Sequence, residues 1–237
     1  MILGYLDLLI SDPLTFLRVF PVVALMVGGS LLIAITVHEF SHSLVAYLLG
    51  DQTSKRLGRL SLNPIRHMDP TGTVLLFLVG FGWGKPVPVN DRALRNGRQG
   101  MALVSGVGPV SNVITAVVFA LPFRAGLLAW PFRLFSTSFG GGVEGVLAQI
   151  FSVIILFNII LAVFNLLPVF PLDGSKVVLG LLPRDMAKSF VRLERYGPVI
   201  LMVVIGLDLI AGVGILRAVV GPMVNYVSQA IVGHTFF

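Results

Sequence analysis

The fold is decided by residues 22–49, which read VVALMVGGSLLIAITVHEFSHSLVAYLL. The stretch is apolar up to His38, and the Gly50-Asp51 pair directly after it is a typical helix stop. At about 1.5 Å per residue, a helix over this stretch is about 42 Å long, which exceeds the ~30 Å hydrocarbon core of a bilayer. The stretch therefore predicts a membrane-spanning helix that carries three ionisable side chains in its second half.

The composition extends this interpretation to the whole chain. The 237 residues are 56% apolar and 12% charged, with a mean hydropathy of +0.94, whereas soluble domains are about 45–50% apolar and 25% charged. A water-soluble globule and a disordered chain are therefore both excluded. Because the chain has no cysteine, disulfides and thiolate metal sites are excluded too, and any metal must be held by His, Asp, Glu or Asn.

Basic residues gather in short loops between the apolar runs, at 55–66, 85–98 and 176–195, and the net charge is +6. This is the positive-inside pattern of a multi-pass membrane protein, so we expect these loops on the cytoplasmic side of a prokaryotic plasma membrane. Because the charges form no basic face or tail, we expect the lipid bilayer and no nucleic acid as the partner.

The apolar runs predict an all-α, polytopic helical bundle with about four full spans, at 22–49, 101–122, 146–167 and 196–217. Acidic residues interrupt residues 1–20, which predicts an interfacial segment, and residues 219–232 predict a short terminal helix. The run at 71–82 is too short to span and lies between two basic loops, so we expect a re-entrant, partly extended segment. We expect one membrane-embedded domain over 1–237, with its core at 22–185 and C-terminal helices at 196–237.

The first span contains an H-E-x-x-H motif, His38-Glu39-Phe40-Ser41-His42. Residues four apart lie about 40° apart around a helix and one turn along it, so both imidazoles point at one spot. Two such nitrogens can hold a zinc ion, while Glu39 lies beside it to take a proton from water. Ionisable groups inside a membrane span are costly unless they have partners, which favours this interpretation over polar packing.

A catalytic zinc usually has three protein ligands, and two acids qualify as the third. Asp173 follows a break in the third span at Pro168 and Pro171, where the kinked chain can aim a carboxylate sideways, at a depth that agrees with that of His38. Asp208 lies in the middle of the expected fourth span, nearer the opposite side, where an interhelical hydrogen bond would also explain it. Depth and side favour Asp173.

Several motifs, in this order, resemble the site-2 protease family of intramembrane zinc metalloproteases. They are HEFSH at 38–42, LNPIRHMDPTGT at 62–73, GWGKPVPVN at 82–90, GPVSN at 108–112 and NLLPVFPLDG at 165–174. The chain is most similar to the compact prokaryotic members that carry neither PDZ nor CBS domains.

The resemblance implies a function and a set of site residues. His38, His42 and Asp173 map to the ligands of one Zn²⁺ ion, Glu39 to the general base, and Asn112 to a polar group near the reacting carbonyl. Asn112 is equally well explained as an amide that packs between helices. The implied activity is hydrolysis of peptide bonds within or near the transmembrane segments of membrane protein substrates, as in regulated intramembrane proteolysis.

A substrate helix must unwind before attack, and its freed backbone then needs hydrogen-bond partners. An exposed edge strand would supply them. The candidate is Lys85, Pro86, Val87, Pro88, Val89 and Asn90, where prolines alternate with valines as in an edge strand. A rigid surface turn would explain this pattern nearly as well.

Two other functions fit a buried metal site: a metal-dependent transporter and a catalytically inactive membrane scaffold. A transporter would show related halves or paired broken helices, but only one span is broken here. A scaffold would not need an acidic residue at position 39. The sequence therefore favours an intramembrane zinc endopeptidase.

Overall fold

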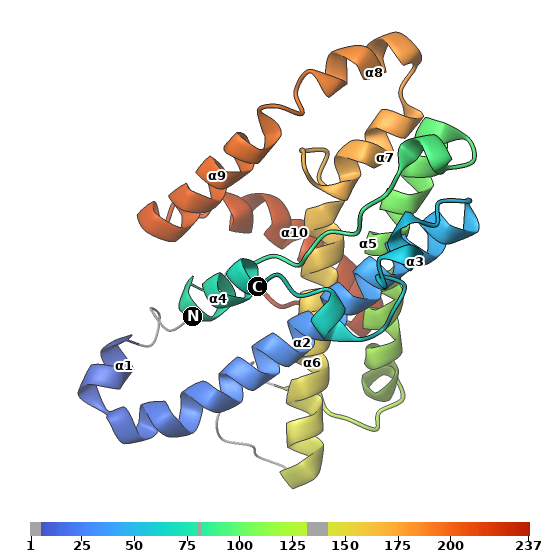
Figure 1. Ribbon diagram of the computed structural model, residues 1–237. Helices are drawn as coiled ribbons and strands as arrows, with labels where there is room; N and C mark the ends of the chain where they lie inside the picture. The colour runs from blue at the N-terminus through green and yellow to red at the C-terminus, as the bar shows by residue number, and fades with distance from the viewer. Residues whose placement is uncertain (1–5, 80–81, 132–141) are drawn as a thin grey trace.

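The computed structural model of the protein describes residues 6–79, 82–131 and 142–237, and in these ranges it is all-helical (Figure 1). Their only β-structure is one antiparallel bridge, between Met68 and Gly84. The helices in chain order are α1 (Leu6–Ser11), α2 (Pro13–Leu48), α3 (Thr53–Arg56), η2 (Pro64–Arg66), α4 (Pro70–Val79), η3 (Asp91–Ala93), α5 (Gly97–Arg124), α6 (Gly142–Asn165), α7 (Asp173–Leu181), α8 (Arg184–Val191), α9 (Gly197–Ala211) and α10 (Ile215–Val232).

Four of these helices, α2, α5, α6 and α10, are long and apolar enough to cross a membrane. The expected class, an all-α membrane protein with about four spans, is therefore confirmed. The helix expected at 22–49 begins earlier, because Asp12 caps it: its side chain accepts the backbone N–H of Thr15 at 3.1 Å, and Pro13 occupies the first turn. In the segment expected at the interface, 1–20, residues 1–5 lie outside the described residues, and the remainder forms α1 and the start of α2.

The fourth span is not where the sequence predicts it. Of the stretch 196–217, residues 197–211 form the 15-residue helix α9 and residues 215–217 begin α10, and the helix long enough to span is the 18-residue α10. Gly212 and Gly214 break the apolar run because both adopt left-handed backbone, with φ of +62° and +78°. A helix of 15 residues covers about 22 Å, less than the hydrocarbon core.

The segment expected to be re-entrant folds back on itself. Of residues 71–82, positions 80 and 81 lie outside the described residues, and the first nine complete the short helix α4. The Met68–Gly84 bridge pairs the chain just before α4 with the chain just after it, so the segment that contains α4 begins and ends at the same point of the structure. Gly72 is needed there, because a Cβ at this position would overlap the backbone of Trp83.

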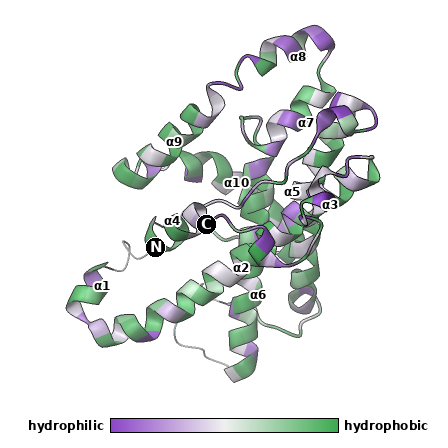
Figure 2. Cartoon of the chain, in the orientation of Figure 1, coloured by the Kyte–Doolittle hydropathy of each residue, from purple (hydrophilic) through white to green (hydrophobic). Residues whose placement is uncertain are grey.

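The core lies where α5 packs against α2, α6 and α7. Buried apolar residues of α5, α6 and α10 form its largest cluster: Ala116, Ala120, Ile155, Leu156, Ile159, Val163, Val220, Val224 and Val232. Hydrophilic residues instead collect around α3, α7 and α8 (Figure 2). The bundle is therefore polar at the end where these short helices lie.

The basic loops meet at this polar end. Arg98, in the first turn of α5, donates to the carbonyl of Leu182 just after α7 at 2.7 Å, and the N–H of Arg95 donates to Leu49 just after α2 at 2.8 Å. The end of α2, the start of α5 and the end of α7 are thus held together, as a shared membrane side requires.

Candidate metal centre

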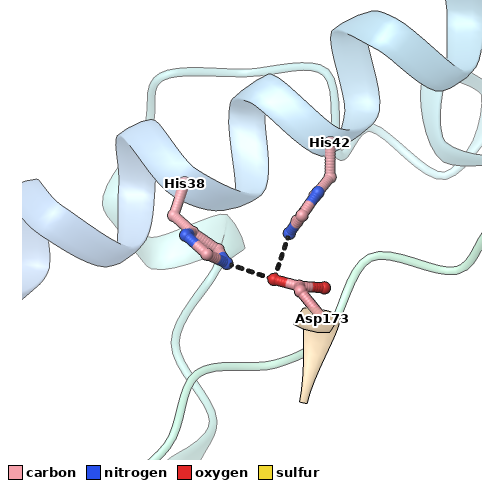
Figure 3. A group of neighbouring side chains, drawn as sticks. All are labelled: His38, His42 and Asp173. Atoms are coloured by element: carbon pink, nitrogen blue, oxygen red, sulfur yellow. Dashed lines mark hydrogen bonds and ion pairs between the residues drawn. The ribbon is translucent and has the colours of Figure 1, made fainter. Parts of the chain in front are cut away.

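His38 and His42 lie one turn apart on α2, which packs against α5, and both side chains are buried. Their ring centroids are 4.6 Å apart and the ring planes are perpendicular. Figure 3 shows that both imidazoles point toward the carboxylate of Asp173. The i, i+4 spacing therefore brings the two Nε2 atoms to one point, as the sequence predicts.

Asp173 is the first residue of α7, and the preceding chain delivers it to the histidines. The third span ends at Asn165, and residues 166–172, which contain Pro168 and Pro171, form a loop that returns to the end of α6, where Gly174 lies against Leu166, before α7 begins. Oδ2 of Asp173 lies 3.0 Å from Nε2 of His38 and 3.1 Å from Nε2 of His42.

These three side chains fit a divalent cation. One ligand atom from each lies within 4.8 Å of the others, and within the described residues this is the only such group of His, Asp and Glu side chains. Tetrahedral Zn²⁺ with ligands at about 2.0 Å separates neighbouring ligand atoms by about 3.3 Å, close to the 3.0 and 3.1 Å separations measured here. Two imidazoles and one carboxylate also form a common set of catalytic zinc ligands.

The other ring nitrogen of each histidine has a buried partner. Nδ1 of His42 lies 2.6 Å from the carbonyl oxygen of Val104, and Nδ1 of His38 lies 2.6 Å from Oδ1 of Asn112. A carbonyl oxygen only accepts hydrogen bonds, so Nδ1 of His42 carries the hydrogen and leaves Nε2 to face Asp173. Partners of this kind fix the ring orientation and tautomer of metal-binding histidines.

Asn112 lies behind His38. Its side chain is fully buried, and its amide nitrogen donates to the carbonyl of Ala34 at 2.9 Å and to Oδ1 of Asn158 at 2.8 Å. Both amide hydrogens are therefore engaged. These contacts support a role in orienting the imidazole, and hydrogen bonding to a reacting carbonyl stays a prediction that nothing in this arrangement tests.

Gly108, on α5, makes room for both imidazoles. A Cβ at this position would lie 2.5 Å from Cε1 and 2.6 Å from Nε2 of His42, and 2.7 Å from Cε1 of His38. Real side chains essentially never approach so closely. The glycine of the G-P-V-S-N motif thus allows α5 to pass directly beside the candidate metal ligands.

Glu39 projects from α2 in a different direction from the two histidines. It is half-buried, and its Oε2 accepts the backbone N–H of Val87 at 3.0 Å. Pro86 and Pro88 have no N–H, so this is the only backbone donor that residues 86–88 possess, and it is directed at Glu39. The segment 85–90 therefore lies directly beside the candidate general base.

Three hydrogen bonds hold this segment. The carbonyl of Lys85 accepts the buried guanidinium of Arg59, the N–H of Lys85 donates to the carbonyl of His67 at 2.8 Å, and the N–H of Asn90 donates to Oδ2 of Asp51 at 2.8 Å. Val87 and Val89 are half-buried while Pro86 and Pro88 are exposed, which is the alternation of an extended chain. The described residues 85–90 pair with no other strand, so strand addition by a substrate stays a prediction.

The buried residues that hold this segment were not predicted from the sequence; they are Asp51, Arg59 and His67. In the sequence, the Gly50-Asp51 pair is explained as a helix stop. In the structure the carboxylate of Asp51 is buried, and it also accepts the N–H of Thr53 at 2.9 Å. Burial alone would raise the pKa of Asp51, but these hydrogen bonds outweigh it and hold the pKa below its usual value.

An apolar cavity of about 360 Å³ lies between α2, α4 and the chain that returns from α4. Ile35 and Thr36, which line it, are one turn before Glu39 on α2. Leu76 and Trp83 line it from the side of the re-entrant segment. The cavity thus lies one helical turn from Glu39 along α2.

Asp208, the other candidate for the third ligand, lies outside this group. Its carboxylate accepts the N–H groups of Ile215 and Leu216, each at 2.7 Å, and so caps the first turn of α10. The acid in this apolar helix is therefore explained by a helix cap across the Gly212–Gly214 break.

Known proteins of one kind are similar to this chain. Residues 129–205 match the model of peptidase family M50. YwhC of Bacillus subtilis (strain 168), named as a candidate zinc metalloprotease, is 41% identical over 176 residues, which are 73% of this chain and 77% of that protein. Rip2 of Mycobacterium tuberculosis (strain H37Rv), named in the same way, is 28% identical over 81% of this chain and 69% of its own length. No solved structure gives a significant match.

Proposed function

The chain belongs to peptidase family M50, the site-2 protease family of zinc metalloproteases, and on that basis we propose that it is an intramembrane endopeptidase. It would hydrolyse peptide bonds within or near the transmembrane segments of other membrane proteins. The observation that carries this proposal is the convergence of His38, His42 and Asp173 on one point inside a bundle of membrane-spanning helices, with Glu39 next to them on α2.

Each site residue takes a separate role in this proposal. His38, His42 and Asp173 hold one Zn²⁺ ion. A zinc ion held by them would supply a Lewis acid that polarises the scissile carbonyl and makes water acidic enough to act as the nucleophile near pH 7. Glu39 accepts the proton from the attacking water and then delivers it to the leaving nitrogen. The N–H of Val87 holds the Glu39 carboxylate in place while it does so.

The substrate approaches on the Glu39 side of α2. The segment on that side is extended and is held by hydrogen bonds to Asp51 and His67. Its extended conformation supports pairing with an unwound substrate segment. It consists of Lys85, Pro86, Val87, Pro88, Val89 and Asn90. The adjacent apolar cavity accepts a large apolar side chain from the same segment. Both features suit a peptide from a membrane span, in which most side chains are apolar.

The site opens toward the cytoplasmic face of the plasma membrane in this proposal. The basic loops meet at one end of the bundle, and Arg98 and Arg95 tie that end together. His38 lies ten residues before the end of α2, which is about 15 Å along a helix. Water from the basic side therefore has the shorter path to the site.

A reconstituted cleavage assay tests the proposal. Purified protein is mixed with a single-span membrane substrate, with and without a zinc chelator, and the fragments are identified by mass spectrometry. We expect cleavage within or near the span that stops with chelator and with Glu39→Gln, while Glu194→Gln, the same change at an exposed residue that is not part of the candidate metal centre, retains it. Chelator-resistant cleavage, or full activity of Glu39→Gln, would refute the proposal. Zinc bound without any cleavage would favour the inactive scaffold.

A further inference from the structure

A line of buried hydrogen bonds runs from α6 through α5 to His38. The side-chain nitrogen of Asn158 donates to the carbonyl of Ile154 at 2.9 Å, and its Oδ1 accepts from Asn112 at 2.8 Å. Oδ1 of Asn112 in turn lies 2.6 Å from Nδ1 of His38. Asn112 and Asn158 are both 0% exposed, so water cannot replace either partner.

Each bond in this line dictates the direction of the next. The carbonyl of Ile154 only accepts, so the amide nitrogen of Asn158 must face it and its oxygen must face Asn112. Asn112 must then present its nitrogen to Asn158, and this nitrogen also donates to the carbonyl of Ala34 at 2.9 Å. Only the oxygen of Asn112 is left for His38, so Nδ1 of His38 has to carry the hydrogen.

We infer that Asn158 is a positioning residue for the metal centre, one that sets the tautomer of His38 through Asn112. With the hydrogen held on Nδ1, the Nε2 lone pair faces the point shared with His42 and Asp173. The inference rests on His38 being a metal ligand, as proposed above. It assigns a function to a polar residue in the middle of a membrane span that contacts neither the ligands nor the candidate base.

The opposite orientation shows what Asn158 prevents. If Asn112 rotated by 180° about its last side-chain bond, its nitrogen would face His38 and require a lone pair on Nδ1. The hydrogen would then lie on Nε2, where a metal has to bind. In the wild type this rotation would also leave Asn158 and the carbonyl of Ala34 facing an oxygen, with no hydrogen between them.

The first test is zinc affinity, measured by competition with a chelator of known affinity. Asn158→Leu keeps the branched shape of the side chain but removes one of the two acceptors that orient Asn112, and we expect it to bind zinc about 10- to 100-fold more weakly. Gln149→Leu is the matched control, because it removes another buried amide from the same helix, away from Asn112. We expect that variant to bind zinc like the wild type, and wild-type affinity in Asn158→Leu would overturn the inference.

A double-mutant cycle separates positioning from structural loss. A carboxylate has no N–H end to misplace, so in Asn112→Asp either oxygen accepts from His38 and the orientation no longer depends on Asn158. Asn158→Leu should then cause no further loss of zinc affinity in the Asn112→Asp background. An equal loss in both backgrounds would show a merely structural role and overturn the inference. If the single variant Asn158→Leu does not fold, Asn112→Asp is compared with the double variant alone, and a further loss of zinc affinity there would overturn the inference.

The affinity assay also separates this inference from the proposed function. Wild-type protein that binds zinc through His38 but cleaves nothing would refute the protease and leave the role of Asn158 intact. Wild-type affinity in both His38→Ala and Asn158→Leu would overturn the ligand assignment and, with it, the role of Asn158.

Discussion

The prediction most closely tied to the geometry is the effect of adding one methyl group at Gly108. A Cβ there would lie 2.5 to 2.7 Å from atoms of both His38 and His42, whereas carbon atoms normally approach to about 3.5 Å. Relief of the overlap requires the rings to move by about 1 Å. Metal–ligand distances tolerate only about 0.2 Å, so both nitrogens would leave their bonding positions together.

The size of the effect follows from this displacement. A misplacement of about 1 Å in a catalytic group costs roughly 100-fold, and loss of two ligands at once makes that a lower limit for zinc affinity. One hundredfold corresponds to about 2.7 kcal/mol. The fold should suffer less, because overpacking costs about 1–3 kcal/mol and alanine regains up to about 1 kcal/mol of helix propensity. Gly108→Ala should therefore be folded but poor in zinc.

A neighbouring glycine of the same helix supplies the control. A Cβ at Gly106 would meet only Val177, at an ordinary 3.7 Å, so Gly106→Ala has the same gain in propensity without the overlap. Zinc per chain is measured after dialysis against a graded series of chelator concentrations, and folding is checked by thermal unfolding in detergent. Gly108→Ala that holds zinc as tightly as Gly106→Ala would refute the arrangement of the imidazoles against α5.

Three further predictions test other parts of the structure. Asp208→Ala should lower the free energy of unfolding by about 1–2 kcal/mol through loss of a helix cap and should keep its zinc. Asp173→Ala should lose zinc, and the reverse result would exchange the roles of the two acids. A Cβ at Gly29, which lines the apolar cavity, meets nothing within 4 Å. Gly29→Leu should therefore partly fill the cavity and raise KM about tenfold or more at unchanged zinc content, and an unchanged KM would exclude the cavity from substrate binding. Asp51→Asn should cost about 1.5 kcal/mol or more at pH 7. The pKa of Asp51 is lower in the folded protein than in the unfolded chain. The stability that this carboxylate contributes is therefore present above the unfolded pKa of about 3.9 and is lost as the pH falls through the folded pKa. Thermal unfolding curves of wild type and variant should thus converge in acid, and a constant gap between them would contradict this.

Local sequence patterns predicted most of the helices but not every boundary. The runs at 101–122 and 146–167 correspond to α5 and α6 because uninterrupted apolar residues specify a span directly. The run 196–217 is equally apolar, yet it breaks where Asp208 reaches across two left-handed glycines to cap the next helix. That break depends on a contact between two helices, which hydropathy does not report.

The candidate site divides in the same way. The convergence of His38 and His42 follows from helix geometry alone, and the prolines before Asp173 indicated the turn that delivers it. The buried partners of the histidines depend on how α5 and α6 are rotated against α2, which no local pattern specifies. Asn158 did carry a signal, because a polar amide within an apolar span asks for an explanation.

The rotation of α2 also determines where a substrate can reach the site. Consecutive helix residues differ by about 100°, so Glu39 points well away from the direction of His38. On the histidine side, Asn112 and Asn158 are fully buried and Gly108 leaves no space even for a methyl group. On the Glu39 side lie the half-exposed segment 85–90 and the apolar cavity. Under the proposed function a peptide approaches past Glu39, so the proton acceptor lies between the substrate segment and the metal ligands. Substitutions that fill the Glu39 side should block substrates and spare zinc, whereas those at Gly108 or Asn158 should weaken zinc binding.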